Sequence, residues 1–222
     1  MSRYLDLLGA STARVGSLLC VGIDPVPSAL PVTFRESHAG IERWIDTLIA
    51  ATAPHAAAFK MNLAYFEALG SEGMRLAEHV RRQIPSEILL IVDAKRGDIG
   101  NTSTMYARAF FDAMNFDAIT VSPYMGEDSL RPFLEFENKF VICLALTSNA
   151  GHADFQTLNT SNGSACEMKL YENVINTVSK WGNPDQLMFV VGATRAELVG
   201  EIRKLIPNHF LLVPGVGAQG GS

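Results

Sequence analysis

The chain has 222 residues, of which 48% are hydrophobic and 18% charged, and its formal net charge is -5. This length and apolar content suit one large α/β domain, and the acidic balance argues against nucleic acid as a partner. An apolar span of about 18 residues and a signal peptide are both missing from the sequence. We therefore expect a cytoplasmic protein that binds a small molecule and contacts no membrane.

Short apolar runs alternate with helical patterns along the chain. The first run, SLLCVGID, ends at Asp24, and the helical pattern after it carries Ile41, Ile45 and Ile49. Six further runs cover residues 56–62, 88–95, 118–124, 140–148, 187–194 and 209–217. Nearly continuous apolar runs are typical of strands that are buried on both faces of a parallel sheet. The sequence therefore predicts repeated βα units.

Polar or turn residues follow each run, and (β/α)8 barrels place their active sites at this end of the strands. A Rossmann fold is disfavoured because no G-x-G-x-x-G follows the first run. We predict an α/β fold of the (β/α)8 TIM barrel class, with residues 1–222 as a single domain. The chain stops shortly after the seventh run, so we expect the eighth βα unit to be absent from it.

The stretch IVDAKRGDIGNT places charged residues where the third run ends. Side chains alternate along a strand, so Asp93 and Lys95 should share one face, and Lys60 ends the neighbouring run. With Asp98, these residues could form an alternating network of two amines and two carboxylates. Simpler interpretations stay open, namely a structural ion pair for Asp93 with Lys95 and a helix N-cap for Asp98.

The segments GIDP, FKMN, DAKRGDIGNT, LTSN and PGVGAQGG, in this order, resemble the orotidine 5'-monophosphate decarboxylase family in its bacterial branch. The resemblance runs from about Cys20 to the end of the chain. It implies a homodimeric enzyme with shared active sites, which converts orotidine 5'-phosphate to uridine 5'-phosphate and CO2 in pyrimidine biosynthesis. It also implies that neither a metal nor another cofactor takes part.

The resemblance assigns roles to residues that match the family's motifs. It implies a catalytic set in which Lys95 protonates C6 of the pyrimidine and Asp98 reaches the partner's site: Lys60, Asp93, Lys95 and Asp98. Asp24 and Thr102 resemble ribose-binding residues, Thr102 again from the partner, and Ser148 resembles a residue that contacts the base. The Gly-rich segment with Pro214 and Gln219 resembles the part of the site that binds the phosphate.

Three other functions stay open. A magnesium-dependent keto-sugar phosphate decarboxylase also carries D-x-K-x-x-D, but its pattern has an acidic residue where Lys60 stands. A Schiff-base aldolase needs a neutral lysine, whereas flanking carboxylates favour the ammonium form. A catalytically silent nucleotide-binding barrel would not need four charges beside the base.

Two further features lie outside these motifs. The Ser/Thr-rich segment 154–164 is long for a βα loop, and we interpret it as a lid over the base. The five histidines have no H-x-x-x-H spacing, so we expect them to have surface or capping roles.

Overall fold

The computed structural model describes residues 3–161, 167–193 and 196–215. The chain divides into two compact units, Met1–Ala94 with Tyr106–Ile119, and Lys95–Met105 with Thr120–Ser222. The single domain expected from the sequence stays a prediction.

Seven strands form one sheet, and their order in the sheet is their order in the chain. They are β1 (Cys20–Ile23), β2 (Ala58–Asn62), β3 (Leu89–Arg96), β4 (Ala118–Val121), β5 (Phe140–Leu146), β8 (Leu187–Val191) and β9 (Leu211–Leu212). The pairs β1–β2, β2–β3, β5–β8 and β8–β9 are parallel. A doubly wound sheet reverses its order at a switch point, whereas a (β/α) barrel does not. The predicted fold class and all seven predicted strands are confirmed.

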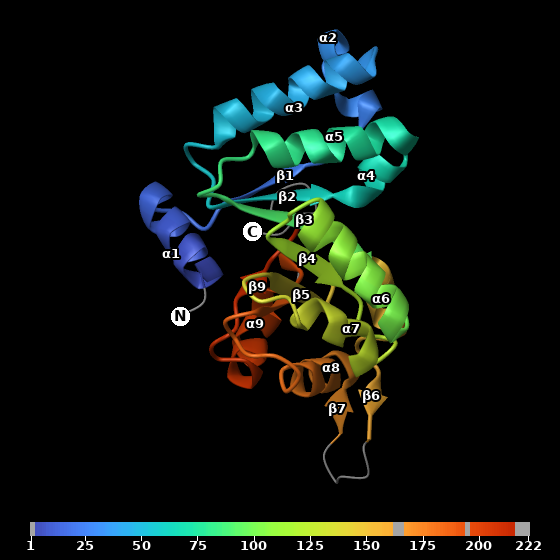
Figure 1. Cartoon of the computed structure of the whole chain (residues 1–222). Coiled ribbons are helices and arrows are strands. Elements are labelled where there is room, and N and C mark those ends of the chain that lie inside the picture. The colour runs from blue at the N-terminus through green and yellow to red at the C-terminus, as the bar shows by residue number, and fades with distance from the viewer. Residues whose placement is uncertain (1–2, 162–166, 194–195, 216–222) are drawn as a thin grey trace. The chain divides into compact units, whose positions relative to one another are not determined.

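In the first unit, helices α3 (His38–Thr52) and α5 (Gly70–Gln83) lie side by side along β1 and β2 (Figure 1). The buried stripe of α3 includes Ile41, Ile45 and Ile49, as its helical spacing predicts. The Ser37 hydroxyl caps this helix by accepting the N–H of Gly40 at 3.1 Å. The remaining helical elements of this unit are α1 (Arg3–Val15), η1 (Pro27–Ala29), α2 (Val32–Arg35), α4 (Leu63–Glu67) and the π-helical η2 (Arg108–Ala113).

The second unit contains α7 (Glu127–Leu134), η3 (Ala150–Asp154), α8 (Leu170–Val178) and α9 (Ala196–Leu205), and α6 (Gly100–Ala107) begins in it. Helix α8 packs on β5 and contacts α9 (Figure 1). Helix α6 begins at Gly100, shortly after β3 ends at Arg96, so its first turn follows the DAKRGD segment closely in the chain.

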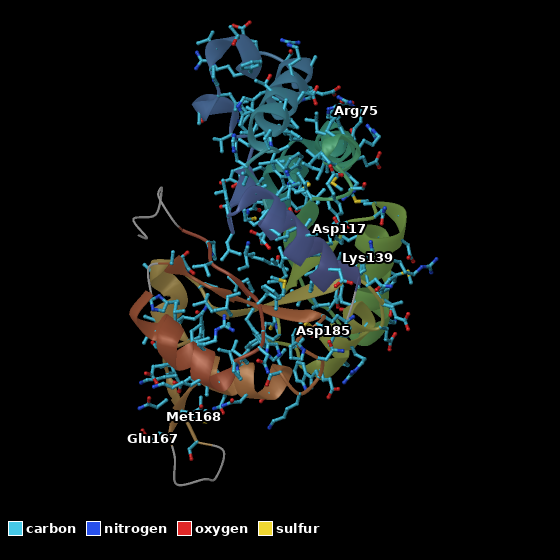
Figure 2. The ribbon with its side chains drawn as sticks, turned by 90° about the vertical axis from the view of Figure 1, so that its left-hand side faces the viewer. Arg75, Asp117, Lys139, Glu167, Met168 and Asp185 are labelled. Atoms are coloured by element: carbon cyan, nitrogen blue, oxygen red, sulfur yellow. The ribbon has the colours of Figure 1, made fainter. Side chains whose placement is uncertain are left out.

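A short antiparallel hairpin interrupts the predicted loop 154–164. Strands β6 (Asn159–Thr160) and β7 (Met168–Lys169) pair, with Asn159 opposite Lys169. Figure 2 shows Glu167 and Met168 next to each other at this hairpin, and Glu167 accepts a hydrogen bond from the Asn159 amide at 3.1 Å. The segment is therefore partly a strand rather than an irregular loop. Its role as a lid stays a prediction.

Three of the five histidines, His79, His152 and His209, are buried, which corrects the expectation of surface roles. His79 is buried in α5, where its Nε2 lies 2.6 Å from Asp46 Oδ1. His209 is buried against the ring of Phe189, with the two ring centroids 5.5 Å apart. A histidine ring with an acidic or aromatic neighbour can be accommodated inside a protein, and the sequence did not reveal these neighbours.

Candidate active site

The predicted site residues of the first unit lie toward the carboxyl ends of β1, β2 and β3. Their register places Gly22 opposite Lys60, and Asn62 opposite Asp93. Lys60 Nζ lies 3.3 Å from Asp93 Oδ2, and the two side chains are only 15% and 12% exposed. Charges this far from water are tolerable because they are paired. The expected approach of Lys60 to Asp93 is confirmed, whereas their catalytic role stays a prediction.

Asp24 is held beside the same strand ends. Its Oδ1 accepts the backbone N–H of Asn62 at 3.1 Å. The Asn62 side chain in turn accepts the N–H of Ala64 at 3.2 Å and caps α4, which follows β2 directly. The Asn62 backbone at the end of β2 therefore holds Asp24, and the start of α4 holds the Asn62 side chain in turn.

Cys20 borders this part of the site and was not predicted to do so. The pKa of its thiol is raised to about 11, mainly by burial, while Lys60 lowers the pKa and the Asp24 and Asp93 carboxylates raise it. The thiol is therefore neutral at neutral pH and a weak nucleophile. No signal in the sequence could have shown this, because a free cysteine in an apolar run usually acts as a small hydrophobic residue.

Lys95 is the first of the predicted site residues in the second unit. Its side chain is exposed, and its backbone is left-handed, with φ 49°. Its backbone N–H donates a hydrogen bond to Thr120 Oγ1 at 2.9 Å. Left-handed non-glycine residues are uncommon and gather at functional sites. The shared face of Lys95 and Asp93 stays a prediction.

Asp98 and Thr102 lie at the start of α6. Asp98 Oδ1 accepts the N–H of Ile99 at 2.7 Å, and the Asp98 backbone exchanges two hydrogen bonds with the Ser103 hydroxyl, at 3.1 and 2.9 Å. These contacts resemble a helix cap, the simpler interpretation of Asp98. Within the described part of the chain, Asp98 forms no ion pair.

Ser148 lies in a loop after β5. Two residues that we did not predict as part of the site contact this loop. The Gln156 amide binds Thr147 twice, accepting its N–H and donating to its hydroxyl, both at 2.9 Å. Gly192 passes so close that a Cβ there would lie 2.8 Å from the Ser148 backbone nitrogen. A lone glutamine and a lone glycine are ordinary loop residues, so the sequence offered no reason to select them.

The last predicted residues follow β9. The Pro214 carbonyl accepts the N–H of Ala193 at 2.8 Å, which ties the end of β9 to the end of β8. Gly215 has φ 100°, a conformation that favours glycine. Gln219 lies outside the described residues.

Among the residues that the structure describes, no group of three or more His, Cys, Asp or Glu side chains is placed to hold a metal ion. No described helix is long and apolar enough to cross a membrane.

Parallel strands in chain order define a protein of the (β/α) barrel class, and a buried ion pair lies toward the carboxyl ends of two of these strands, where such barrels place their active sites. The family model described as Orotidine 5'-phosphate decarboxylase / HUMPS family matches residues 17–222, and the chain belongs to this family. The resemblance seen in the sequence is confirmed.

Individual relatives agree with this assignment. The orotidine 5'-phosphate decarboxylase of Flavobacterium johnsoniae is 51% identical over 210 residues, which is 93% of this chain and 75% of the relative. The Leishmania donovani OMP decarboxylase structure superposes with a TM-score of 0.85 at 39% identity, covering 97% of this chain and 80% of the other. The Leishmania donovani UMP synthase has a TM-score of 0.89 at 39% identity, but this chain spans only 47% of its length.

Proposed function

We propose that the protein decarboxylates orotidine 5'-phosphate to uridine 5'-phosphate and CO2, in the biosynthesis of UMP and in the cytoplasm. Membership of the decarboxylase family supports the reaction. The observation that carries the proposal is the Lys60–Asp93 ion pair at the ends of β2 and β3, with Lys95 two residues further along β3.

The reaction explains why charge is needed here. Loss of CO2 from C6 leaves a carbanion in the plane of the ring, where the π system does not delocalise it. Stabilisation must therefore come from fixed charge, and preorganised charge is usually the largest catalytic contribution. In this proposal the Lys95 ammonium faces C6, stabilises the developing carbanion and then delivers the proton.

The other charged residues support Lys95. Asp93 lies beside the substrate carboxylate and repels it as the bond breaks, a contribution by ground-state destabilisation. Lys60 holds Asp93 through the 3.3 Å ion pair. Asp98 helps to orient Lys95. No metal or other cofactor has a role in this scheme.

The remaining predicted residues bind the nucleotide. In this proposal Asp24 and Thr102 bind the ribose hydroxyls, and Ser148 contacts the pyrimidine. Pro214 and Gln219 belong to the segment that binds the phosphate. The phosphate is remote from the bond that breaks, so its binding energy can be used to orient the reacting ring.

We further propose a homodimer in which Asp98 and Thr102 enter the partner's site. Two apolar side chains next to them support this arrangement, because Ile99 is 53% exposed and Met105 is 54% exposed. Exposed apolar side chains beside polar functional residues are typical of a surface that another subunit covers.

The test is loss of the substrate's ultraviolet absorbance after orotidine 5'-phosphate is added in EDTA, with uridine 5'-phosphate identified as the product. The magnesium-dependent alternative predicts that EDTA stops the reaction. The aldolase alternative predicts a lysine adduct that borohydride traps in the presence of substrate. Substrate loss in EDTA without a trapped adduct is the result that our proposal expects.

A further inference from the structure

Thr120 is a buried polar residue in the middle of β4 and outside every motif discussed above. It is 1% exposed, and its strand neighbours Ile119 and Val121 are fully buried. Its Oγ1 accepts the backbone N–H of Lys95 at 2.9 Å. A hydroxyl in this position therefore contacts the main chain of the residue that we propose as the proton donor.

Two features of the Lys95 backbone are irregular for a strand. In a regular parallel sheet, a backbone N–H donates to a carbonyl of the neighbouring strand, whereas the Lys95 N–H donates to the Thr120 hydroxyl. The φ of 49° at Lys95 also lies outside the strand region. Such a conformation persists only where the surroundings determine it.

The residues after Lys95 are fastened to the end of β4 as well. The N–H of Ser122 donates to the Arg96 carbonyl at 2.8 Å. A Cβ on Gly97 would lie 2.8 Å from the Ser122 carbonyl oxygen, so the two backbones touch. The segment after Lys95 is therefore anchored to the end of β4. The hydrogen bond to Thr120 anchors the Lys95 backbone itself.

We propose that Thr120 is a positioning residue for Lys95: its hydroxyl maintains the left-handed backbone that directs the Lys95 ammonium toward C6 of the substrate. This inference rests on the proposed decarboxylation. In this proposal Thr120 acts through the Lys95 backbone and not on the substrate itself. A rotation at Lys95 moves the far end of a long side chain, and a displacement of about 1 Å can cost roughly 100-fold in rate.

The experiment compares Thr120→Val, Thr120→Ser and the wild-type chain. Valine has nearly the shape of threonine but offers no acceptor, whereas serine keeps the acceptor. The matched control is Thr52→Val, which removes a hydroxyl that binds the Leu48 carbonyl at 2.7 Å in α3. Each protein is measured for kcat and KM with orotidine 5'-phosphate, Kd for uridine 5'-phosphate, and the midpoint of urea unfolding.

For Thr120→Val we expect kcat to fall by about 10-fold to 100-fold. Its Kd for uridine 5'-phosphate should stay within about 3-fold of wild type, because an interaction used only in the transition state contributes little to ground-state binding. Thr120→Ser should recover most of the lost kcat. A merely structural role would lower the urea midpoint of Thr120→Val and leave kcat of the folded enzyme unchanged, which would overturn the proposal.

If Thr120→Val does not fold, a second pair of variants still tests the proposal. Thr120→Ala and Thr120→Ser both lose the methyl group and differ only in the hydroxyl oxygen. Equal kcat in these two variants contradicts the positioning role. An inactive wild-type chain overturns the proposed function and this role together, whereas equally active wild-type and Thr120→Val proteins overturn only the role of Thr120.

Discussion

Each charged residue at the strand ends is held by a different neighbour. Asp93 holds Lys60, the Asn62 backbone holds Asp24, and Thr120 holds the backbone of Lys95. A charged group removed from water needs such a partner. Because the protein itself supplies these contacts, the Lys60, Asp93 and Asp24 charges and the Lys95 backbone are held before the reaction begins, and preorganised charge is the condition for electrostatic catalysis.

His209 gives a prediction at the same scale. Burial lowers the pKa of its ring, and the nearby Arg203 lowers it further. Neither ring nitrogen has a hydrogen-bond partner among the described residues. The folded-state pKa lies below the unfolded value of about 6.5. As the pH falls below about 6.5, the unfolded chain therefore binds the proton more readily, and the free energy of unfolding decreases.

The measurement is the midpoint of urea unfolding at about pH 8 and about pH 5.5, on either side of the unfolded pKa. We expect His209→Leu to lose less stability between these pH values than the wild-type chain. The control is His55→Leu, which removes an exposed histidine and should behave as wild type. An unchanged pH dependence in His209→Leu would show that His209 does not titrate as described.

At the scale of elements, Gly192, the residue after β8, contacts the loop that follows β5. A Cβ on Gly192 would lie 2.8 Å from three atoms of Ser148, including backbone atoms that cannot turn away. We expect Gly192→Ala to destabilise the fold by about 1–3 kcal/mol, the usual cost of overpacking. It should also weaken uridine 5'-phosphate binding, because Ser148 is the proposed base contact.

The matched substitution is Gly200→Ala in α9, where no atom lies within 4 Å of the added Cβ. This change should stabilise the chain by roughly 0.5–1 kcal/mol, because alanine favours a helix interior. Urea unfolding and nucleotide titration of both variants provide the check. Equal changes in stability and in nucleotide affinity for the two substitutions would mean that the contact with Ser148 affects neither quantity.

The elements differ in how well the sequence predicted them. The seven strands were predictable because each is a nearly continuous apolar run between polar turns. The hairpin β6–β7 was not, since each of its strands has only two residues and carries no alternation. Within the site, Lys60 and Asp93 could be paired from strand order alone. The contacts of Thr120 and Gln156 could not, because they depend on a left-handed backbone at Lys95 and on the path of a loop.

At the scale of the whole molecule, the proposed homodimer with shared active sites predicts complementation. Lys95→Ala and Asp98→Ala should each be nearly inactive. In a mixed dimer, one site combines Lys95 of one chain with Asp98 of the other and is intact. Random mixing of equal amounts should therefore restore about one quarter of the sites, as expected for two-fold symmetric pairs.

The readout is turnover of orotidine 5'-phosphate after the two variants are unfolded together and refolded. Each variant treated alone is the control. If Asp98 acts within its own chain, every mixed dimer lacks an intact site, and the mixture stays as inactive as its components.

The central claim is that Lys95 supplies the charge and the proton for a decarboxylation that needs no metal. Its most direct test is the initial rate of absorbance loss with orotidine 5'-phosphate in EDTA, measured for the wild-type chain and for Lys95→Ala. We predict turnover by the wild type and none by the variant, with uridine 5'-phosphate bound by both. Nucleotide binding without turnover by the wild type would contradict the claim and indicate a silent nucleotide-binding barrel.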